Sequence, residues 1–380
     1  MFIAIRDLRF AWGRFLLMAV VVGLVAFLTT LLSGLASGLI KNNISGLVQL
    51  DVTHLAFEYN NKPSYRNSMI DRSMWEGWRA GEGVVQAEPL GHTLFNARML
   101  DATPLDDVVL WGMEPGSFLE PEVVRGVQLG AQDNGVIISR LMVDRGLEIG
   151  DVFILDRVLT ELEVIGVADE YNIGHVPIVY LPLRKWQEAT YGPPGGPPPG
   201  EELPGILFDY ASLVALQLAP GLDAAVLESS DIDNGTLTVD KQGAYNASTG
   251  YREEVMTVQM IQAFLIIISA LVIGAFFTVW TIQRTQEIGL VKALGASNMY
   301  LLRDALAQVL ILLLTGTLVG CAGALWLGQI FIASGNPFEL QLTTTLASAV
   351  LLVLAGLVGS ALSIRLITQV DPLIALGRQR

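Results

Sequence analysis

FLLMAVVVGLVAFLTTLLSGLASGLI, the stretch Phe15–Ile40, contains 26 consecutive residues without a charged side chain. Three more stretches of this kind follow later in the chain: Val255–Gln283 with 29 residues, Ala305–Phe338 with 34 and Leu340–Ile364 with 25. A helix needs about 20 apolar residues to cross the hydrocarbon core of a bilayer. The sequence therefore predicts an α-helical membrane protein with four transmembrane helices. We place these helices at 14–40, 256–283, 304–332 and 343–366.

The residues between the first two predicted helices differ in composition from the rest of the chain. Only 16% of the 380 residues are charged, whereas a soluble domain has about 25%. Residues 41–255 nevertheless hold 14 Lys and Arg against 32 Asp and Glu, a net charge of −18. This acidic segment argues against nucleic acid as a partner, because DNA binding requires a basic face. The single cysteine, Cys321, excludes an internal disulfide and a metal site built from several cysteines.

The positions of the basic residues predict the orientation in the membrane. Outside 41–255, the nine Lys and Arg residues occupy three places: before the first helix, between the second and third, and after the fourth. Basic residues favour the cytoplasmic side, so we expect both termini to be cytosolic and the acidic segment to lie outside the cell membrane. The predicted cytosolic segments are 1–13, 284–303 and 367–380, and the predicted outer segments are 41–255 and the turn at 333–342.

The first 13 residues are predicted to form an interfacial helix. Phe2, Ile5, Leu8 and Trp12 recur at helical spacing, with charged residues between them. The alternative interpretation of the N-terminus is a cleaved signal peptide. The apolar part of such a peptide spans about 7–15 residues, and the 26 uncharged residues found here favour a retained anchor.

Residues 41–255 are long enough for one large or two small lobes, and we expect an α+β extracytoplasmic domain. Short β-rich runs such as Val108–Trp111, Gly135–Ser139 and Ile178–Leu181 indicate strands. The Pro- and Gly-rich stretch at 192–205 indicates an exposed loop, because proline and glycine disfavour helices and central strands.

The domain shows no pattern of catalytic or metal-binding residues. Its three histidines, His54, His92 and His175, match no zinc-binding spacing. The sequence has neither a G-x-S-x-G nor an H-E-x-x-H motif, and its carboxylates are scattered. We therefore expect no metal site, and we interpret the acidic residues as a solvated surface.

The loop between the second and third helices carries the most specific motif. It reads RTQEIGLVKALGAS over Arg284–Ser297. Ile288 and Leu294, with the valine between them, fall on one helical face, Gly295 is placed to end that helix, and Ser297 can cap the next. An exposed apolar face flanked by charges normally binds a partner. The alternative is that this helix lies on the membrane surface.

This loop resembles the signature E-I-G-x-x-(K/R)-A-L-G-A-S of permeases of the MacB/FtsX type, the membrane subunits of a class of ABC transporters. The resemblance covers the whole chain, because one helix, a large outer domain, three more helices and cytosolic termini match the family plan. Further similar segments are Gly135–Ser139, Leu147–Asp151, Glu163–Val167, Val179–Leu183 and the closing Val370–Leu376, which resembles the family's D-P-x-x-A-L.

The resemblance implies a transporter subunit rather than an enzyme. The chain has no G-x-x-x-x-G-K-[ST] motif, so ATP and Mg would bind a separate ATPase subunit, and no intrinsic cofactor is expected. Family members combine two permeases with two ATPases and work by mechanotransmission, in which nucleotide binding moves the cytosolic ends and stiff helices carry the motion outward. The residues implied to couple to the ATPase are Glu287, Ile288, Lys292, Leu294 and Gly295.

Two of the predicted helices carry glycines four residues apart, Gly34 and Gly38 in the first and Gly316 and Gly320 in the third. Such spacing permits close approach of helix backbones. We expect these glycines to serve helix packing, and the first helix to form the contact between two copies in a homodimer.

The resemblance also bears on what is moved. The size and plan are most like the haem-exporter permeases of the family, so we expect outward transport of an amphiphilic cargo, with haem as the specific candidate. Met256 and Met260 share a helix face and supply soft ligands suited to haem iron, and Tyr251 and the propionate-pairing Arg252 precede them. The alternative is that both methionines only fill packing gaps. Other family members export lipids, peptides or antibiotics, and an FtsX-like branch controls an extracellular enzyme without transport, so these alternatives stay open.

Overall fold

The computed structural model describes residues 12–60, 62–132, 134–197, 200–283, 295, 297–334, 336–339 and 342–368. The chain divides into two compact units. The helical unit combines Met1–Leu39 with Val255–Arg380, and the inserted domain is Ile40–Glu254. The predicted interfacial helix and the predicted C-terminal tail lie almost entirely outside the described residues.

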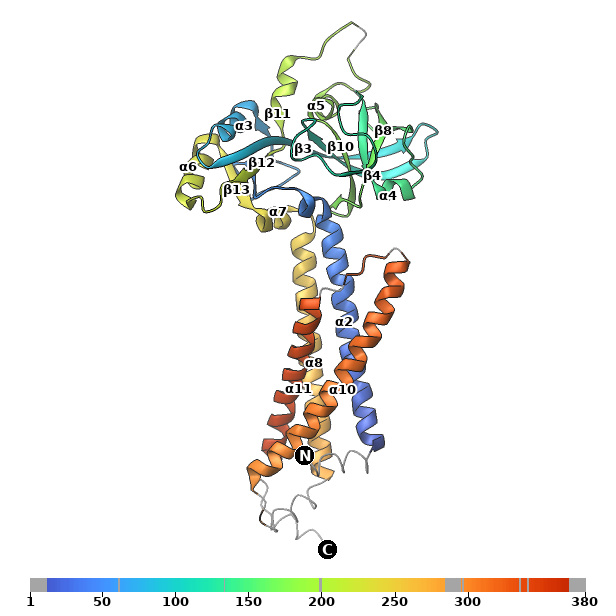
Figure 1. The fold of residues 1–380 in the computed structure, drawn as a ribbon, viewed down its shortest axis with the longest axis vertical. Coiled ribbons are helices and arrows are strands. Elements are labelled where there is room, and N and C mark those ends of the chain that lie inside the picture. Colours follow the sequence, from blue (N-terminus) through green and yellow to red (C-terminus); the bar gives the residue numbers. More distant parts are fainter. Residues whose placement is uncertain are drawn as a thin grey trace. The chain divides into compact units, whose positions relative to one another are not determined.

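A long helix occupies each of the four charge-free stretches (Figure 1). These helices are α2 (Trp12–Gln49), α8 (Tyr251–Gln283), α10 (Asn298–Ala333) and α11 (Leu342–Thr368). Within the described residues, three stretches are long and apolar enough to cross a membrane: Phe15–Gln49, Tyr251–Phe276 and Arg303–Ala333. The apolar section found in α11, Thr345–Ala361, is shorter.

The helix α2 extends beyond its predicted end at residue 40. It continues through Lys41 and two asparagines to Gln49. A charge-free stretch measures the apolar span, whereas a helix ends where its backbone hydrogen bonds end. Lys and Asn cost less than about 0.7 kcal/mol each relative to Ala in a helix, so polar residues alone do not stop it.

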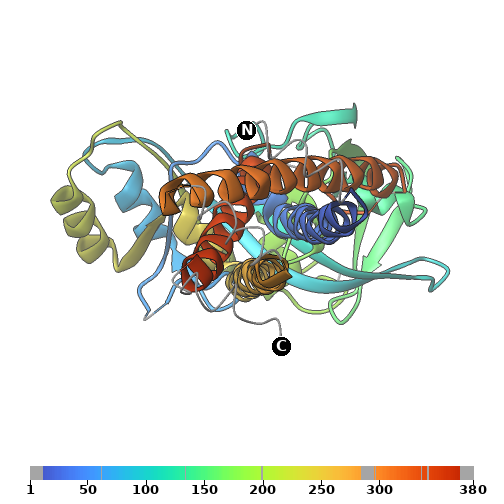
Figure 2. The same ribbon diagram turned by 90° about the horizontal axis from the view of Figure 1, so that it is seen from below.

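The four helices share one apolar core, and Figure 2 shows α2 and α8 nearly end-on with α10 running across them. Buried side chains from every helix meet in it, among them Val22 of α2, Ile273 of α8, Leu313 of α10 and Leu352 of α11, each at most 2% exposed. In a lipid environment, helices associate through this kind of close van der Waals packing rather than through exclusion of water.

The inserted domain is an α+β unit with thirteen strands among its described residues. The strands are β1 (His54–Glu58), β2 (Ile70–Asp71), β3 (Val84–Met99), β4 (Pro104–Met113), β5 (Val123–Gly126), β6 (Gly135–Ser139), β7 (Val152–Leu155), β8 (Thr160–Ala168), β9 (Asn172–Ile173), β10 (Val176–Pro182), β11 (Tyr210–Ala211), β12 (Leu213–Leu218) and β13 (Thr236–Asp240). The helices are α3 (Arg72–Arg79), α4 (Arg140–Asp144), α5 (Leu183–Tyr191), α6 (Ala224–Asn234) and α7 (Lys241–Ala247), with a short 3₁₀ helix η1 (Gly205–Asp209).

Eleven of these strands form one sheet in the order β13-β1-β12-β3-β4-β10-β6-β8-β5, with β7 paired to β3 and β8, and β9 paired to β10. The pairs β4–β10 and β6–β8 are parallel, and the other pairs are antiparallel. The remaining strands, β2 and β11, pair with each other. The predicted strands at Val108–Trp111, Gly135–Ser139 and Ile178–Leu181 all fall within this sheet, and the loop predicted at 192–205 has no regular structure in its described residues before η1.

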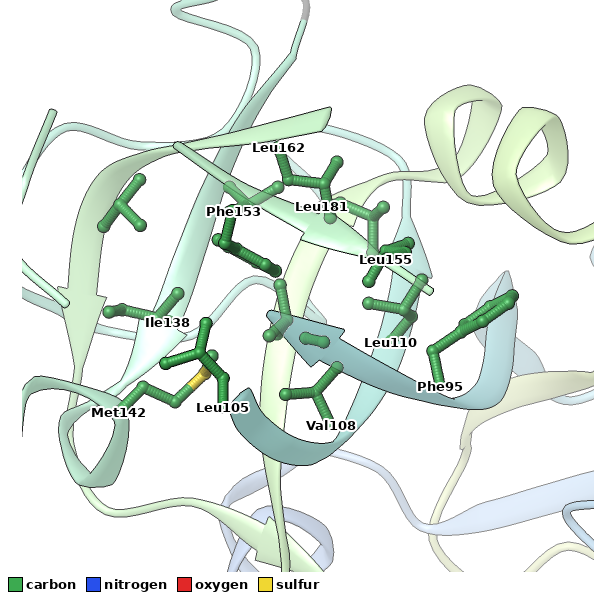
Figure 3. Close-up of a cluster of buried hydrophobic side chains, with 14 of the residues drawn as sticks. Phe95, Leu105, Val108, Leu110, Ile138, Met142, Phe153, Leu155, Leu162 and Leu181 are labelled. Atoms are coloured by element: carbon green, nitrogen blue, oxygen red, sulfur yellow. The ribbon is translucent and has the colours of Figure 1, made fainter. Parts of the chain in front are cut away.

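The long strand β3 takes part in two separate apolar cores. Its first half pairs with β12 and contributes Ala87 to a core that contains Trp75 and Trp78 of α3. Its second half pairs with β4 and β7 and contributes Phe95 and Ala97 to the larger core drawn in Figure 3. One continuous strand therefore connects both halves of the domain.

The indole of Trp186 is fully buried between α5 and the centre of the sheet. It packs on Gly91 of β3 and Gly112 of β4, which are paired in register. A Cβ atom at either position would lie too close to the indole ring or its Cβ. These two glycines therefore create the slot that the indole fills.

Candidate functional site

The two predicted methionines are exposed on one face of α8. Met256 is 57% exposed and Met260 is 56% exposed. The same face continues through Phe264, Ile267 and Leu271, all more than half exposed, because residues three or four apart lie on one side of a helix. Within the helical unit, this stripe is an apolar surface that the described residues leave uncovered.

The other two predicted cargo residues, Tyr251 and Arg252, belong to the inserted domain. Tyr251 is 8% exposed, its ring centroid lies 6.1 Å from that of Tyr245, and Gln242 Nε2 donates to its hydroxyl over 3.5 Å. Arg252 is exposed. The four predicted residues are thus divided between the two units, two in each.

The glycines of α10 lie where this helix crosses α2. A Cβ atom on Gly320 would lie 2.8 Å from Ala26 Cβ and closer still to the carbonyl oxygen of Gly23, and one on Gly316 would lie 2.8 Å from Val22 Cγ1. Ordinary carbon–carbon contacts are about 3.5–4.0 Å. The two backbones approach this closely only because α10 has hydrogen at these positions.

The glycines of α2 pack against the residues that precede α11. A Cβ on Gly34 would overlap the ring of Phe338, and one on Gly38 would overlap the backbone of Pro337. The Glu339 N–H also donates to the Gly34 carbonyl oxygen over 3.0 Å. Both glycine pairs thus make close contacts within one chain, and a contact between two copies through the first helix stays a prediction.

The structure describes only the end of the predicted coupling segment. Glu287, Ile288, Lys292 and Leu294 lie outside the described residues. Gly295 has φ +96°, a left-handed conformation that glycine adopts without steric cost. Ser297 caps α10 by accepting a hydrogen bond from the Tyr300 N–H over 3.2 Å, as its position in the sequence predicts.

A polar cluster that the sequence did not predict lies in the inserted domain, around Asn43 near the end of α2. Asn43 is fully buried, donates to the Thr249 carbonyl oxygen over 3.2 Å, and accepts from Ser248 Oγ over 2.8 Å. Nearby, His175 Nε2 lies 2.7 Å from Glu254 Oε1, and Nδ1 lies 3.1 Å from the Asn42 side-chain oxygen. The cluster joins the domain's share of α2 and of α8 to the turn between β9 and β10.

Nothing in the spacing of these residues indicates the cluster. The two partners in each of these contacts are at least 79 residues apart in the chain. His175 adopts φ +64°, which is uncommon for a residue with a side chain. Within the described residues, no group of three His, Cys, Asp or Glu side chains is placed to hold a metal ion.

A protein-family model matches the part of the chain that contains the last three long helices. Residues 260–372 match the family model described as FtsX-like permease C-terminal. This match begins at Met260 in α8 and covers all of α10 and α11. It also includes the segment around Gly295.

Similarity to individual proteins extends over the full chain. A protein named as the permease HrtB of a hemin transport system in Staphylococcus haemolyticus is 24% identical over 383 residues, which is 99% of each chain. The macrolide export ATP-binding/permease protein MacB of Acinetobacter baylyi is 32% identical over 127 residues, 33% of this chain and 19% of that protein. The crystal structure of the periplasmic region of MacB from Actinobacillus actinomycetemcomitans aligns with 55% of this chain at 13% identity and a TM-score of 0.37. On the sequence matches, the chain is similar over its full length to permeases named for hemin transport, and its residues 260–372 match the FtsX-like permease C-terminal model.

Proposed function

We propose that the chain is the membrane-spanning subunit of an ATP-driven exporter whose cargo is an amphiphilic molecule, with haem as the specific candidate. The observation that carries this proposal is the full-length similarity to a permease named for hemin transport, which covers 99% of both chains. The FtsX-like match over α8, α10 and α11 supports the permease assignment independently of the cargo.

The energy would come from a separate ATP-binding subunit, present in two copies with two copies of this chain. The segment from Glu287 to Gly295 would contact that subunit, because its apolar face is flanked by charged residues and needs a partner. The left-handed backbone at Gly295 supports a sharp change of chain direction just before α10. Movement at this point would enter α10 directly, since α10 begins three residues later.

The proposed topology has both termini and the 284–303 loop in the cytosol and the inserted domain outside. Its support is the distribution of the nine Lys and Arg residues outside 41–255. They all lie in the three segments that this topology places in the cytosol or at its border with the membrane. Labelling with a membrane-impermeant maleimide tests it after Cys321→Ala removes the native thiol. We expect Gly205→Cys to be labelled in intact cells and Met299→Cys only after permeabilisation. The reverse pattern contradicts the topology.

The exposed methionines of α8 support haem as the cargo. A thioether is a soft ligand that haem iron accepts, and Met256 and Met260 present two of them one helical turn apart on an uncovered apolar face. A second copy of the chain placing its own α8 opposite would enclose a planar apolar molecule between the two stripes. The simpler alternative is that the flexible methionine side chains only face lipid.

The test uses the full chain with its ATPase in lipid nanodiscs, with ATP hydrolysis and the haem Soret band measured during titration with hemin. We expect hemin to stimulate hydrolysis several-fold in the wild type. A Met256→Ala/Met260→Ala double variant should lose both the Soret shift and the stimulation. Met299→Ala is the matched control, because Met299 is also exposed, at 65%, but lies at the start of α10.

The outcomes separate the candidate functions. An absent Soret shift, or identical titrations for the double variant and the wild type, overturns haem binding by α8. Stimulation by erythromycin instead of hemin identifies a macrolide exporter. Hydrolysis that no cargo changes, in a complex whose ATPase is active, favours a signalling scaffold that controls an extracellular enzyme.

A further inference from the structure

The inserted domain contains a cavity of about 800 Å³ that the proposed export function does not use. Parts of the chain that are remote in sequence line it, among them the loop around Tyr65 and Arg66, the strand β3 at His92, the turn at Arg157 and the helix α5. Sites for small molecules in proteins typically enclose about 300–1,000 Å³. Its volume is therefore that of a ligand-binding site.

The charge of the cavity is opposite to that of the domain. Residues 41–255 carry 32 acidic side chains against 14 basic ones, yet two arginines, Arg66 and Arg157, and one carboxylate, Glu58, line the cavity. Glu58 already accepts a hydrogen bond from the Met69 N–H over 3.1 Å. A cavity with a local excess of cations in an acidic domain favours an anion.

The two arginines of the cavity also differ from most other arginines of the domain in their pairing. Seven of the ten arginines in the domain form an ion pair or a hydrogen bond, namely Arg72, Arg79, Arg98, Arg125, Arg140, Arg145 and Arg184. The side chains of Arg66 and Arg157 form neither with any part of the chain that the structure describes. Arg157 is also held at φ +71° in the turn between β7 and β8, a conformation with a steric cost for a side-chain-bearing residue.

His92 adds a neutral donor to the cavity. The Trp111 Nε1–H donates to His92 Nδ1 over 3.1 Å, and because an indole only donates, the proton of the neutral imidazole must lie on Nε2. Burial, with a smaller contribution from the Arg66 charge, lowers the pKa of His92 to about 4, so the ring is neutral near pH 7. No acceptor for the Nε2 donor is found among the described residues.

Aromatic and apolar side chains line part of the wall, beside polar residues such as Asn96, Thr190 and Ser212. Tyr65 lies 5.1 Å from the His92 ring, and Trp186 meets Tyr191 edge-to-face with 5.6 Å between centroids. Leu94 lines the same cavity and is 40% exposed. Such a wall suits an apolar ring system, whereas a simple inorganic anion would leave these surfaces in water.

We propose that this cavity binds an amphiphilic carboxylate, with its ring-bearing apolar body against the aromatic wall and its carboxylate paired with Arg66 and Arg157. The site uses none of the α8 methionines, and it stands whether or not the chain exports haem. The ligand's carboxylate would give bidentate pairing to two arginines that have no acidic partner among the described residues.

The test uses the full chain in nanodiscs and two probes that differ only in charge. These are 1-pyrenebutyrate, which carries a carboxylate, and 1-pyrenebutanol, which does not, both measured by energy transfer from tryptophan against empty nanodiscs. We expect saturable binding of the butyrate that Arg66→Gln and Arg157→Gln each weaken by about tenfold or more, the usual scale of a lost charge-assisted hydrogen bond. Arg125→Gln is the control, because Arg125 is exposed, paired with Glu148 over 3.6 Å and outside the cavity; it should bind like the wild type.

Hydrogen exchange of the same protein gives a second readout that does not depend on the variants. The butyrate should slow exchange at 65–69 and 186–191, and the butanol should not. Equal binding of the two probes, equal weakening by Arg125→Gln, or the absence of protection in these segments overturns the proposal. If hemin does not stimulate ATP hydrolysis but pyrenebutyrate still binds in the cavity, the export of haem is contradicted and this proposal is not.

Discussion

A methyl group added to Gly320 should force α10 and α2 apart. In Gly320→Ala the new Cβ would lie 2.8 Å from Ala26 Cβ and 2.8 Å from the Phe27 backbone nitrogen, with the Gly23 carbonyl oxygen nearer still. The carbon–carbon distance falls short of ordinary contact by about 1 Å. Backbone atoms cannot swing aside as a flexible side chain can, so the helices themselves must separate by about that amount.

The expected cost follows from the core that the crossing supports. Overpacking a well-packed site typically destabilises a protein by about 1–3 kcal/mol, and a cost of about 2 kcal/mol corresponds to roughly 4–8 °C in Tm for a unit of this size. Separation would also loosen the contacts of Val22 with the buried residues of the helical core. We therefore expect less hemin-stimulated ATP hydrolysis together with the lower Tm.

Thermal unfolding in nanodiscs measures the first effect, and ATP hydrolysis with the partner subunit measures the second. Gly323→Ala is the matched control, since it adds the same methyl one turn along α10, where its nearest contact is the side-chain atom Phe27 Cδ2 at 3.3 Å. We expect a Tm change in this control of at most about 1 °C. A Gly320→Ala protein as stable and active as the control would refute the close crossing.

Three further predictions concern other parts of the chain. Glu287→Ala should lower ATP turnover by the assembled transporter without changing expression, and wild-type turnover would count against its coupling role. Gly112→Ala should lower the stability of the inserted domain by about 1–3 kcal/mol, because the new methyl would overlap Trp186, whereas Gly205→Ala, with open space around it, should change denaturant unfolding little. Because the folded-state pKa of His92 is lowered to about 4 from the usual 6.5, the unfolded state binds the proton first, so this histidine's stabilisation is complete above pH 6.5 and is lost as the pH falls towards 4. Thermal unfolding compared with His92→Gln should show that difference, and parallel pH profiles would contradict it.

The helices could be predicted from the sequence because their cause is local. An uncharged stretch such as Phe15–Ile40 excludes nearly every alternative to a helix in or near a membrane. The extension of α2 to Gln49 could not be predicted in this way. The apolar pattern ends at the expected edge of the lipid, whereas the helix continues beyond it. The cap at Ser297 was predictable, because its hydrogen bond reaches only three residues along the chain.

The sheet and its polar sites could not be predicted, because their contacts are remote in sequence. The strand runs at 108–111 and 178–181 are visible as β-rich segments, but nothing local indicates that β4 and β10 lie parallel and adjacent. The cavity joins Arg66 to Arg157 across more than 90 residues of chain. Each arginine alone is indistinguishable from a solvated surface residue, and only the fold shows that neither pairs with an acid in the part of the chain that the structure describes.

The continuity of β3 has a consequence for how the inserted domain comes apart. Ala87 and Phe95 lie on the same strand but in different cores. Unfolding of one half of the domain would therefore take away part of the strand against which the other half packs. The halves should therefore open together, with amides in β12 and β7 exchanging at one common slow rate. The inserted domain would then unfold in one cooperative step, without a less stable boundary between its two halves. A force applied at one end of β3 would be transmitted along the strand to the other core.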